Sequence, residues 1–217
     1  MTDKSAASIK AERAARPAIE LAQDGAELSP KNPCDLSHAH LRLGIDVGST
    51  TVKLAVLNDD NQIVYAKYQR HHTDVRACAR DLFEGAATVL PTAQMTCAIT
   101  GSGGLLLSQW LDLEFVQEVI ASKRAVETLI PQTDCAIELG GEDAKIIYFD
   151  NGIEQRMNGT CAGGTGAFID QMASLLHTDA SGLNELAKGA TQIHPIASRC
   201  GVFAKSDVQP LLNEGAA

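Results

Sequence analysis

Short apolar runs, separated by glycine-rich or acidic turns, make up most of the chain from residue 43 onward. These runs are rich in β-branched residues and short enough to favour strands over helices. Six of the predicted strands fall into two groups of three: residues 43–46, 52–57 and 63–68, then residues 135–139, 145–149 and 153–157. Turn residues at 58–61 and 150–152 separate the later strands of each group, and Asn151-Gly152 is the strongest hairpin signal in the chain. The repeated strand–hairpin–strand pattern predicts two related halves.

Apolar residues at helical spacing lie between and after these strands. They predict helices at residues 75–90, 116–129 and 167–176, and a helix start at 202–204. Residues 96–100 are typical of a buried strand, and residues 101–104 are predicted to form a strand-end turn or a loop lining a cleft. The fold class is therefore α/β. We expect a first domain at residues 43–133 and a second at residues 134–217.

Residues 1–42 differ in composition from the rest of the chain. Residues 5–22 are rich in Ala, Glu, Lys and Arg but are interrupted by Pro17, and a Pro-rich stretch follows at 29–33. This pattern predicts a poorly ordered, solvated leader and linker. Docking of the leader onto another module is the alternative.

The first turn of each strand group carries candidate chemistry. Residues 44–53 (GIDVGSTTVK) and 138–146 (ELGGEDAKI) each place glycines beside a carboxylate between two strands. Glycines let the backbone approach a phosphate, turn N–H groups can cradle its oxygens, and a carboxylate can hold Mg²⁺ through water. One such turn alone is more often only a hairpin. Two of them together favour a nucleotide site.

These turns resemble the two phosphate loops of the actin/Hsp70/sugar-kinase ATPase superfamily. Two further segments, residues 158–168 (NGTCAGGTGAF) and 198–207 (SRCGVFAKSD), resemble the ATP-dependent activators of 2-hydroxyacyl-CoA dehydratases, the group that includes the benzoyl-CoA reductase ATPase subunits. The resemblance covers residue 43 to the end. It implies an actin-like ATPase (ribonuclease H-like) fold of two related α/β domains, and the second domain is expected to be truncated. The amino-acid sequence is most similar to long multi-domain members of this family, so we expect an N-terminal piece of a larger protein.

The resemblance assigns roles to the two turns. Asp46 is the expected catalytic carboxylate and holds Mg²⁺ through water, while Ser49 and Thr50 donate to phosphate oxygens. Lys53 is expected mid-strand, with no need to contact nucleotide. Asp143 and Glu142 are the other expected catalytic residues, although the relatives usually carry Gln in place of Glu142. The remaining cofactor-binding residues are expected to be Gly48, Thr51, Gly140, Gly141, Gly163 and Gly164.

The six cysteines fall into two groups. Cys34, Cys78, Cys97 and Cys135 lie in the leader, a helix and two apolar strands, where a small buried thiol is ordinary. Cys161 and Cys200 each precede a predicted helix start, where the helix dipole and free N–H groups stabilise a thiolate or an anionic iron–sulfur cluster. From the residues alone, two unpaired core cysteines remain the alternative. The resemblance implies that Cys161 and Cys200 hold one [4Fe–4S] cluster shared across a homodimer.

Composition limits the class of protein. The chain has 217 residues, 45% of them hydrophobic, and a formal net charge of −9, which disfavours nucleic acid or an anionic membrane as partner. No apolar run approaches the ~20 residues of a spanning helix, and no signal peptide is visible. A cytoplasmic location is therefore predicted, in which cysteines serve as thiols or metal ligands.

The resemblance implies an ATPase that drives one-electron transfer from ferredoxin or flavodoxin to a 2-hydroxyacyl-CoA dehydratase or a benzoyl-CoA reductase-like component. ATP, Mg²⁺ and a [4Fe–4S] cluster are the expected cofactors. Three alternatives remain: a kinase of a small hydroxylated or carboxylate substrate, a nucleotide-dependent interaction module without redox activity, and an inert fragment.

Overall fold

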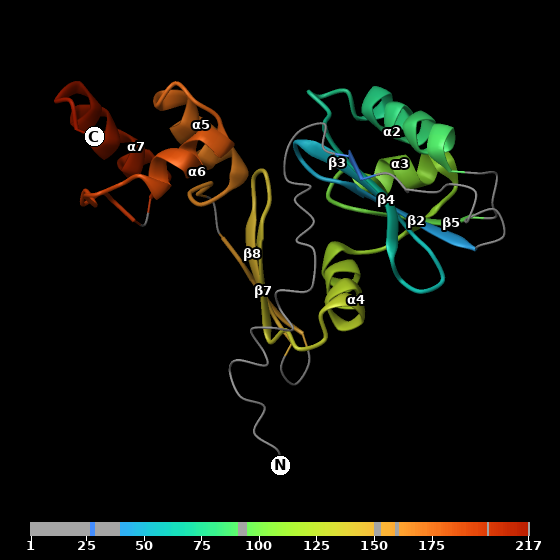
Figure 1. Ribbon diagram of the computed structural model, residues 1–217. Coiled ribbons are helices and arrows are strands. Elements are labelled where there is room, and N and C mark those ends of the chain that lie inside the picture. The colour runs from blue at the N-terminus through green and yellow to red at the C-terminus, as the bar shows by residue number, and fades with distance from the viewer. Residues whose placement is uncertain are drawn as a thin grey trace, which may run out of the picture.

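Two β-sheets organise the chain in the computed structural model, which describes residues 27–28, 40–90, 95–149, 153–158, 161–198 and 200–216 (Figure 1). The first sheet is mixed, in the order β1-β4-β3-β2-β5-β6. Its strands are β1 (Glu27–Leu28), β2 (Leu41–Val47), β3 (Thr51–Leu57), β4 (Ile63–Arg70), β5 (Met95–Thr100) and β6 (Glu114–Phe115). The turn predicted at 150–152, Cys34 and most of the predicted leader lie outside the described residues.

The core lies on one face of this sheet. Strand β2 alternates buried and partly exposed residues, so Leu41, Leu43, Ile45 and Val47 all point to the same side. Helices α2 (Val75–Val89) and α3 (Gly104–Leu111) cover that face. Strands β2, β3 and β4 form an antiparallel meander, and β5 runs parallel to β2. The hairpin between β2 and β3 is therefore held at one end of a rigid sheet.

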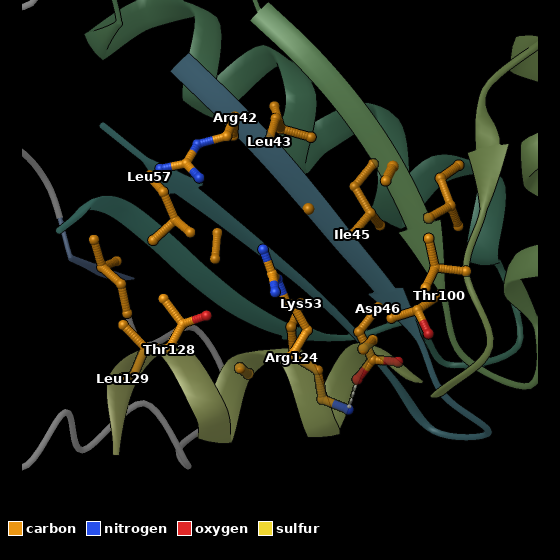
Figure 2. A pocket seen from close by; sticks show the side chains of 18 of the residues that line it. Arg42, Leu43, Ile45, Asp46, Lys53, Leu57, Thr100, Arg124, Thr128 and Leu129 are labelled. Carbon is orange, nitrogen blue, oxygen red and sulfur yellow. Dashed lines mark hydrogen bonds and ion pairs between the residues drawn. The ribbon is translucent and has the colours of Figure 1, made fainter. Parts of the chain in front are cut away.

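Helix α4 (Glu118–Leu129) lies across the opposite face of the sheet, and a partly open cavity of about 740 Å³ lies between the helix and the sheet. Asp46 and Lys53 lie at one end of this cavity, and Leu57 and Leu129 at the other (Figure 2).

The second sheet is an antiparallel meander of β7 (Cys135–Leu139), β8 (Ala144–Tyr148) and β9 (Glu154–Met157). Three helices follow it and cluster together at one end of the β7–β8 hairpin (Figure 1): α5 (Gly166–Leu175), α6 (Ala180–Lys188) and α7 (Gly201–Asn213). The buried ammonium of Lys145 in β8 joins this sheet to α4 through Glu118, and it also lies 3.4 Å from Glu138 of β7.

The predicted strands are confirmed to within two residues at each end, and the predicted division into domains stays a prediction. Two boundaries differ from the sequence-based expectation. Val116 is not helical, because its N–H donates to the Ile99 carbonyl at 2.8 Å and continues the pairing of β6 with β5. Gly104 is not part of the turn predicted at 101–104, because it begins α3.

Candidate functional site

The first glycine-rich hairpin joins β2 to β3. The Gly48 N–H donates to the Thr51 carbonyl at 2.9 Å, so Thr51 closes the turn through its backbone while its side chain is buried. Asp46 and Lys53 are cross-strand neighbours, and Lys53 Nζ lies 2.8 Å from Asp46 Oδ2. Lys53 lies within β3, as expected. It also places a cation on the carboxylate predicted to hold Mg²⁺, a pairing that the hairpin register would have indicated.

The second glycine-rich hairpin joins β7 to β8. The Gly140 N–H donates to the Asp143 carbonyl at 2.7 Å and closes the turn. Glu142 and Asp143 are exposed at its tip. Lys145 points away from the turn into the ion pair with Glu118. Burial lowers the pKa of the Lys145 ammonium, but hydrogen bonding and attraction to Glu118 and Glu138 outweigh it, so the net pKa is raised.

The two hairpins meet although they are far apart in sequence. A Cβ atom placed on Gly141 would lie 2.6 Å from Thr50 Oγ1 and 2.8 Å from Ser49 Oγ. A side chain at position 141 would therefore clash with the Ser49 and Thr50 side chains unless these shift. The structure therefore brings the Ser49 and Thr50 hydroxyls against the backbone of Gly141.

The second pair of predicted site residues lies at the starts of two helices. Cys200 is the N-cap of α7, and Cys161 precedes the short loop that leads into α5. The Gly163 N–H donates to Cys161 Sγ at 3.4 Å. Hydrogen bonds to the Cys161 sulfur from the backbone N–H of Gly201, then from that of Gly163 and from the Cys200 thiol, lower the pKa of Cys161.

The loop from residue 161 to 165 is held by its own hydrogen bonds. Thr165 is fully buried, donates through Oγ1 to the Ala162 carbonyl at 2.5 Å, and caps α5 by accepting from Phe168 N–H. Gly164 has a φ of +83°, a backbone conformation that L side chains rarely adopt. The Asn158 side chain donates to the Cys161 carbonyl at 2.8 Å. Neither Asn158 nor Thr165 stands out in the sequence as a functional residue.

Backbone hydrogen bonds connect the second hairpin to the cysteine loop. Gly166 N–H donates to the Gly140 carbonyl and Ala167 N–H to the Gly141 carbonyl, both at 2.8 Å. The first turn of α5 thus rests on the glycine turn at one side and continues from the Cys161 loop at the other. An ion pair of 2.9 Å between Arg70 in β4 and Asp170 in α5 adds a side-chain link between the first sheet and α5.

The described residues contain no group of three or more His, Cys, Asp or Glu side chains placed to hold a metal. Cys78 is buried in α2 and Cys97 is half-buried in β5, where burial raises the pKa of its thiol. Cys161 and Cys200 are therefore a pair within this part of the chain. Among the helices of the described ranges, none is both long and apolar enough to cross a membrane.

A sequence profile identifies the family. The profile of the BadF/BadG/BcrA/BcrD ATPase family matches residues 43–217. The chain belongs to this family. Within it, the chain is 35% identical over 181 residues to the (R)-2-hydroxyglutaryl-CoA dehydratase activating ATPase of Acidaminococcus fermentans, a match that covers 80% of the chain and 68% of that relative. It is 37% identical over 179 residues to the activator of lactoyl-CoA dehydratase of Anaerotignum propionicum, with the same two coverages.

Solved structures give the same grouping. The crystal structure of A. fermentans (R)-2-hydroxyglutaryl-CoA dehydratase component A has a TM-score of 0.74 at 32% identity, covering 82% of this chain and 70% of that one. The activator of 2-hydroxyisocaproyl-CoA dehydratase from Clostridium difficile with bound ADPNP has a TM-score of 0.70 at 29% identity, covering 82% and 67%. The predicted family and the predicted actin-like α/β fold are confirmed.

Proposed function

We propose that this ATPase-family chain belongs to an activator that couples ATP hydrolysis to the transfer of one electron from ferredoxin or flavodoxin to a 2-hydroxyacyl-CoA dehydratase or benzoyl-CoA reductase-like component. The observation that carries the proposal is the contact between the two loops that carry Cys161 and Cys200 at helix starts, in a chain whose glycine hairpins also face each other. A kinase of small molecules would need the hairpins but not the thiols. The relatives named as dehydratase activators support the same assignment.

The hairpins supply what a nucleoside triphosphate requires. The Ser49 and Thr50 hydroxyls are donors for phosphate oxygens, and the lack of a side chain at Gly141 lets the second turn lie directly against them. Lys53 adds a cation beside the first turn, since its ammonium is 3.5 Å from the position of a Cβ on Gly48. The neighbour with bound ADPNP supports nucleotide binding here.

Carboxylates from both hairpins would act on the bound nucleotide. Asp46 is half-exposed and would hold Mg²⁺ through water, with Lys53 sharing its charge between Asp46 and the phosphates. Asp143, exposed on the second turn, would orient the attacking water. The Glu142 carboxylate would repel phosphate unless it binds Mg²⁺ or points away from the phosphate, so we place Glu142 at the edge of the site.

The thiol pair fits half of a four-iron cluster. Cysteine thiolates are the usual ligands of such clusters, and backbone N–H groups directed at sulfur, as at Cys161, help to set the reduction potential. A cluster held here would supply a one-electron carrier. Four thiolates require a second copy of the chain, because the described residues bring no third ligand near the pair. Val202 and Phe203, both more than 60% exposed beside Cys200, give a second copy an apolar surface to cover.

Coupling between the two sites would pass through α5. The Gly140 and Gly141 carbonyls accept hydrogen bonds from the first turn of α5, so a movement of the second hairpin towards a γ-phosphate would pull that turn along. The Cys161 loop continues directly into the same turn. A nucleotide-driven shift of the hairpin would then change the hydrogen bonds and exposure of the Cys161 sulfur.

Iron content after anaerobic reconstitution tests the proposal. The wild type and Cys97→Ser should both hold about four irons per dimer, whereas Cys161→Ser or Cys200→Ser should lose the cluster, since each removes two of four thiolates by symmetry. ATPase activity should survive in part in all four proteins. Retention of the full iron content by Cys161→Ser would refute the shared cluster. An iron-free wild type that phosphorylates a small hydroxyl or carboxylate compound would favour the kinase.

A further inference from the structure

The loops that carry Cys161 and Cys200 are in direct backbone contact. A Cβ placed on Gly163 would lie 3.2 Å from the Gly201 nitrogen and 3.4 Å from Cys161 Sγ. A Cβ on Gly201 would lie 3.2 Å from the Gly163 Cα and 3.1 Å from the Phe168 ring. Glycine at both positions thus lets the two loops touch. The two loops cannot separate unless α5 and α7, which contact each other, also move apart.

The Cys161 sulfur belongs to this contact, because it accepts from the Gly163 N–H at 3.4 Å. Gly163 in turn lies against Gly201, the residue that follows Cys200. Both residues are partly exposed, so a small oxidant can reach them. The other described cysteines, Cys78, Cys97 and Cys135, lie on separate elements of the fold. Proximity, access and a fixed backbone all favour a disulfide between two cysteines.

We propose that Cys161 and Cys200 form a reversible intramolecular disulfide when no metal holds the thiolates, with a small disulfide such as oxidised glutathione as oxidant. The Cys161 sulfur attacks one glutathione sulfur, and the first glutathione leaves as a thiol. The Cys200 sulfur then attacks Cys161 Sγ and displaces the second glutathione. Two electrons pass from the cysteine sulfurs to glutathione, and the two thiol protons end on the released glutathione molecules.

The disulfide would control assembly of the iron site. With both sulfurs bonded to each other, neither can bind iron, so a thiol reductant must act before the metal is loaded. This consequence rests on the proposed function, whereas the disulfide itself depends only on the position of the two cysteines. The pair would also protect the iron-free chain, because a disulfide is reducible while sulfinic and sulfonic acids are largely not.

Mass spectrometry of the iron-free full chain tests the proposal. The protein is equilibrated anaerobically in a series of glutathione buffers, quenched with acid, alkylated and digested with trypsin, which cuts after Arg156, Lys188, Arg199 and Lys205. We expect residues 157–188 linked to residues 200–205, and a linked fraction that follows oxidised glutathione over the square of reduced glutathione. The Cys161→Ser and Cys200→Ser variants should lose this linked peptide, and Cys135→Ser should keep it.

The same chain unfolded in denaturant gives the matched baseline, because all six cysteines then pair by chance and sequence separation alone. The wild-type measurement does not depend on how any variant folds. An equal pattern of links in folded and unfolded chain would overturn the proposal, as would mixed glutathione adducts in place of the link. If the link forms but the reduced protein binds no iron, the disulfide stands and the proposed function fails. If iron binds but no link forms, the reverse holds.

Discussion

Gly141→Ala should separate the two hairpins and weaken nucleotide binding more than it weakens the fold. The new Cβ would sit 2.6 Å from Thr50 Oγ1 and 2.9 Å from Thr50 Cγ2, so rotating the threonine only exchanges one clash for another. Ordinary contact begins at 3.4 Å, which leaves a shortfall of about 0.8 Å. A misplacement of about 1 Å can cost about 100-fold in rate, so we expect ATP hydrolysis to fall about 10- to 100-fold.

The assay compares binding of Mg-ADPNP by calorimetry, steady-state ATPase activity and the melting temperature. Gly44→Ala is the matched control, because no atom lies within 4 Å of its added Cβ and it lies in β2, the strand that leads into the first hairpin. It should bind nucleotide like the wild type. Gly141→Ala combined with Thr50→Ser should recover part of the activity, since serine keeps the hydroxyl and lacks Cγ2. Wild-type affinity and turnover in folded Gly141→Ala would show that the hairpins do not jointly hold the nucleotide.

Three further perturbations address single residues. Asp46→Asn keeps the size of the side chain but removes its charge. Mg²⁺-dependent ATPase activity should therefore fall by about 100-fold or more, while the melting temperature is preserved. Unchanged turnover would exclude Asp46 as the Mg²⁺ carboxylate. Lys145→Met removes the buried cation between Glu118 and Glu138, and it should lower the free energy of unfolding in denaturant by about 1–3 kcal/mol. Lys188→Met is the control, because its ion pair with Glu185 is exposed, and it should lower that free energy by less than about 0.5 kcal/mol. Burial raises the pKa of Tyr65 from 10.0 to about 12, so the stability that this shift contributes should be complete below pH 10 and disappear as the pH rises to about 12. Tyr65→Phe should therefore flatten the dependence of unfolding free energy on pH over that window. An unchanged profile would contradict this.

Periodicity and turn chemistry were sufficient for most of the fold. Strands β2, β3, β7 and β8 follow from β-branched runs flanking glycine turns, because the signal is local. Helix α3 was missed since Leu105, Leu106 and Trp110 are exposed, which removes the alternation of polar and apolar faces. Helix α6 was also missed, although Asp179 accepts from Gly182 N–H at 2.8 Å in the usual N-cap pattern and offered a usable signal.

The candidate site was predictable as a list of residues but not as an arrangement. Glycines and carboxylates in the hairpins, and cysteines before helices, can be read from the sequence because each depends on its immediate neighbours. The contact of Gly141 with Thr50 and the ion pair of Arg70 with Asp170 depend on how distant elements meet, and no local pattern encodes that. The Lys53–Asp46 pair lies between these cases, since it follows once the hairpin register is known.

The backbone of α5 connects the proposed nucleotide site to the proposed redox pair. Thr165, fully buried, fixes the end of the Cys161 loop to α5, and Gly166 N–H fixes α5 to the Gly140 carbonyl. A Cβ on Gly166 would lie 3.3 Å from that carbonyl, so the contact leaves little freedom for independent movement. Any displacement of the glycine turn must either break these hydrogen bonds or carry the loop with it. Because each such hydrogen bond contributes about 0.5–1.5 kcal/mol, the loop should follow the turn.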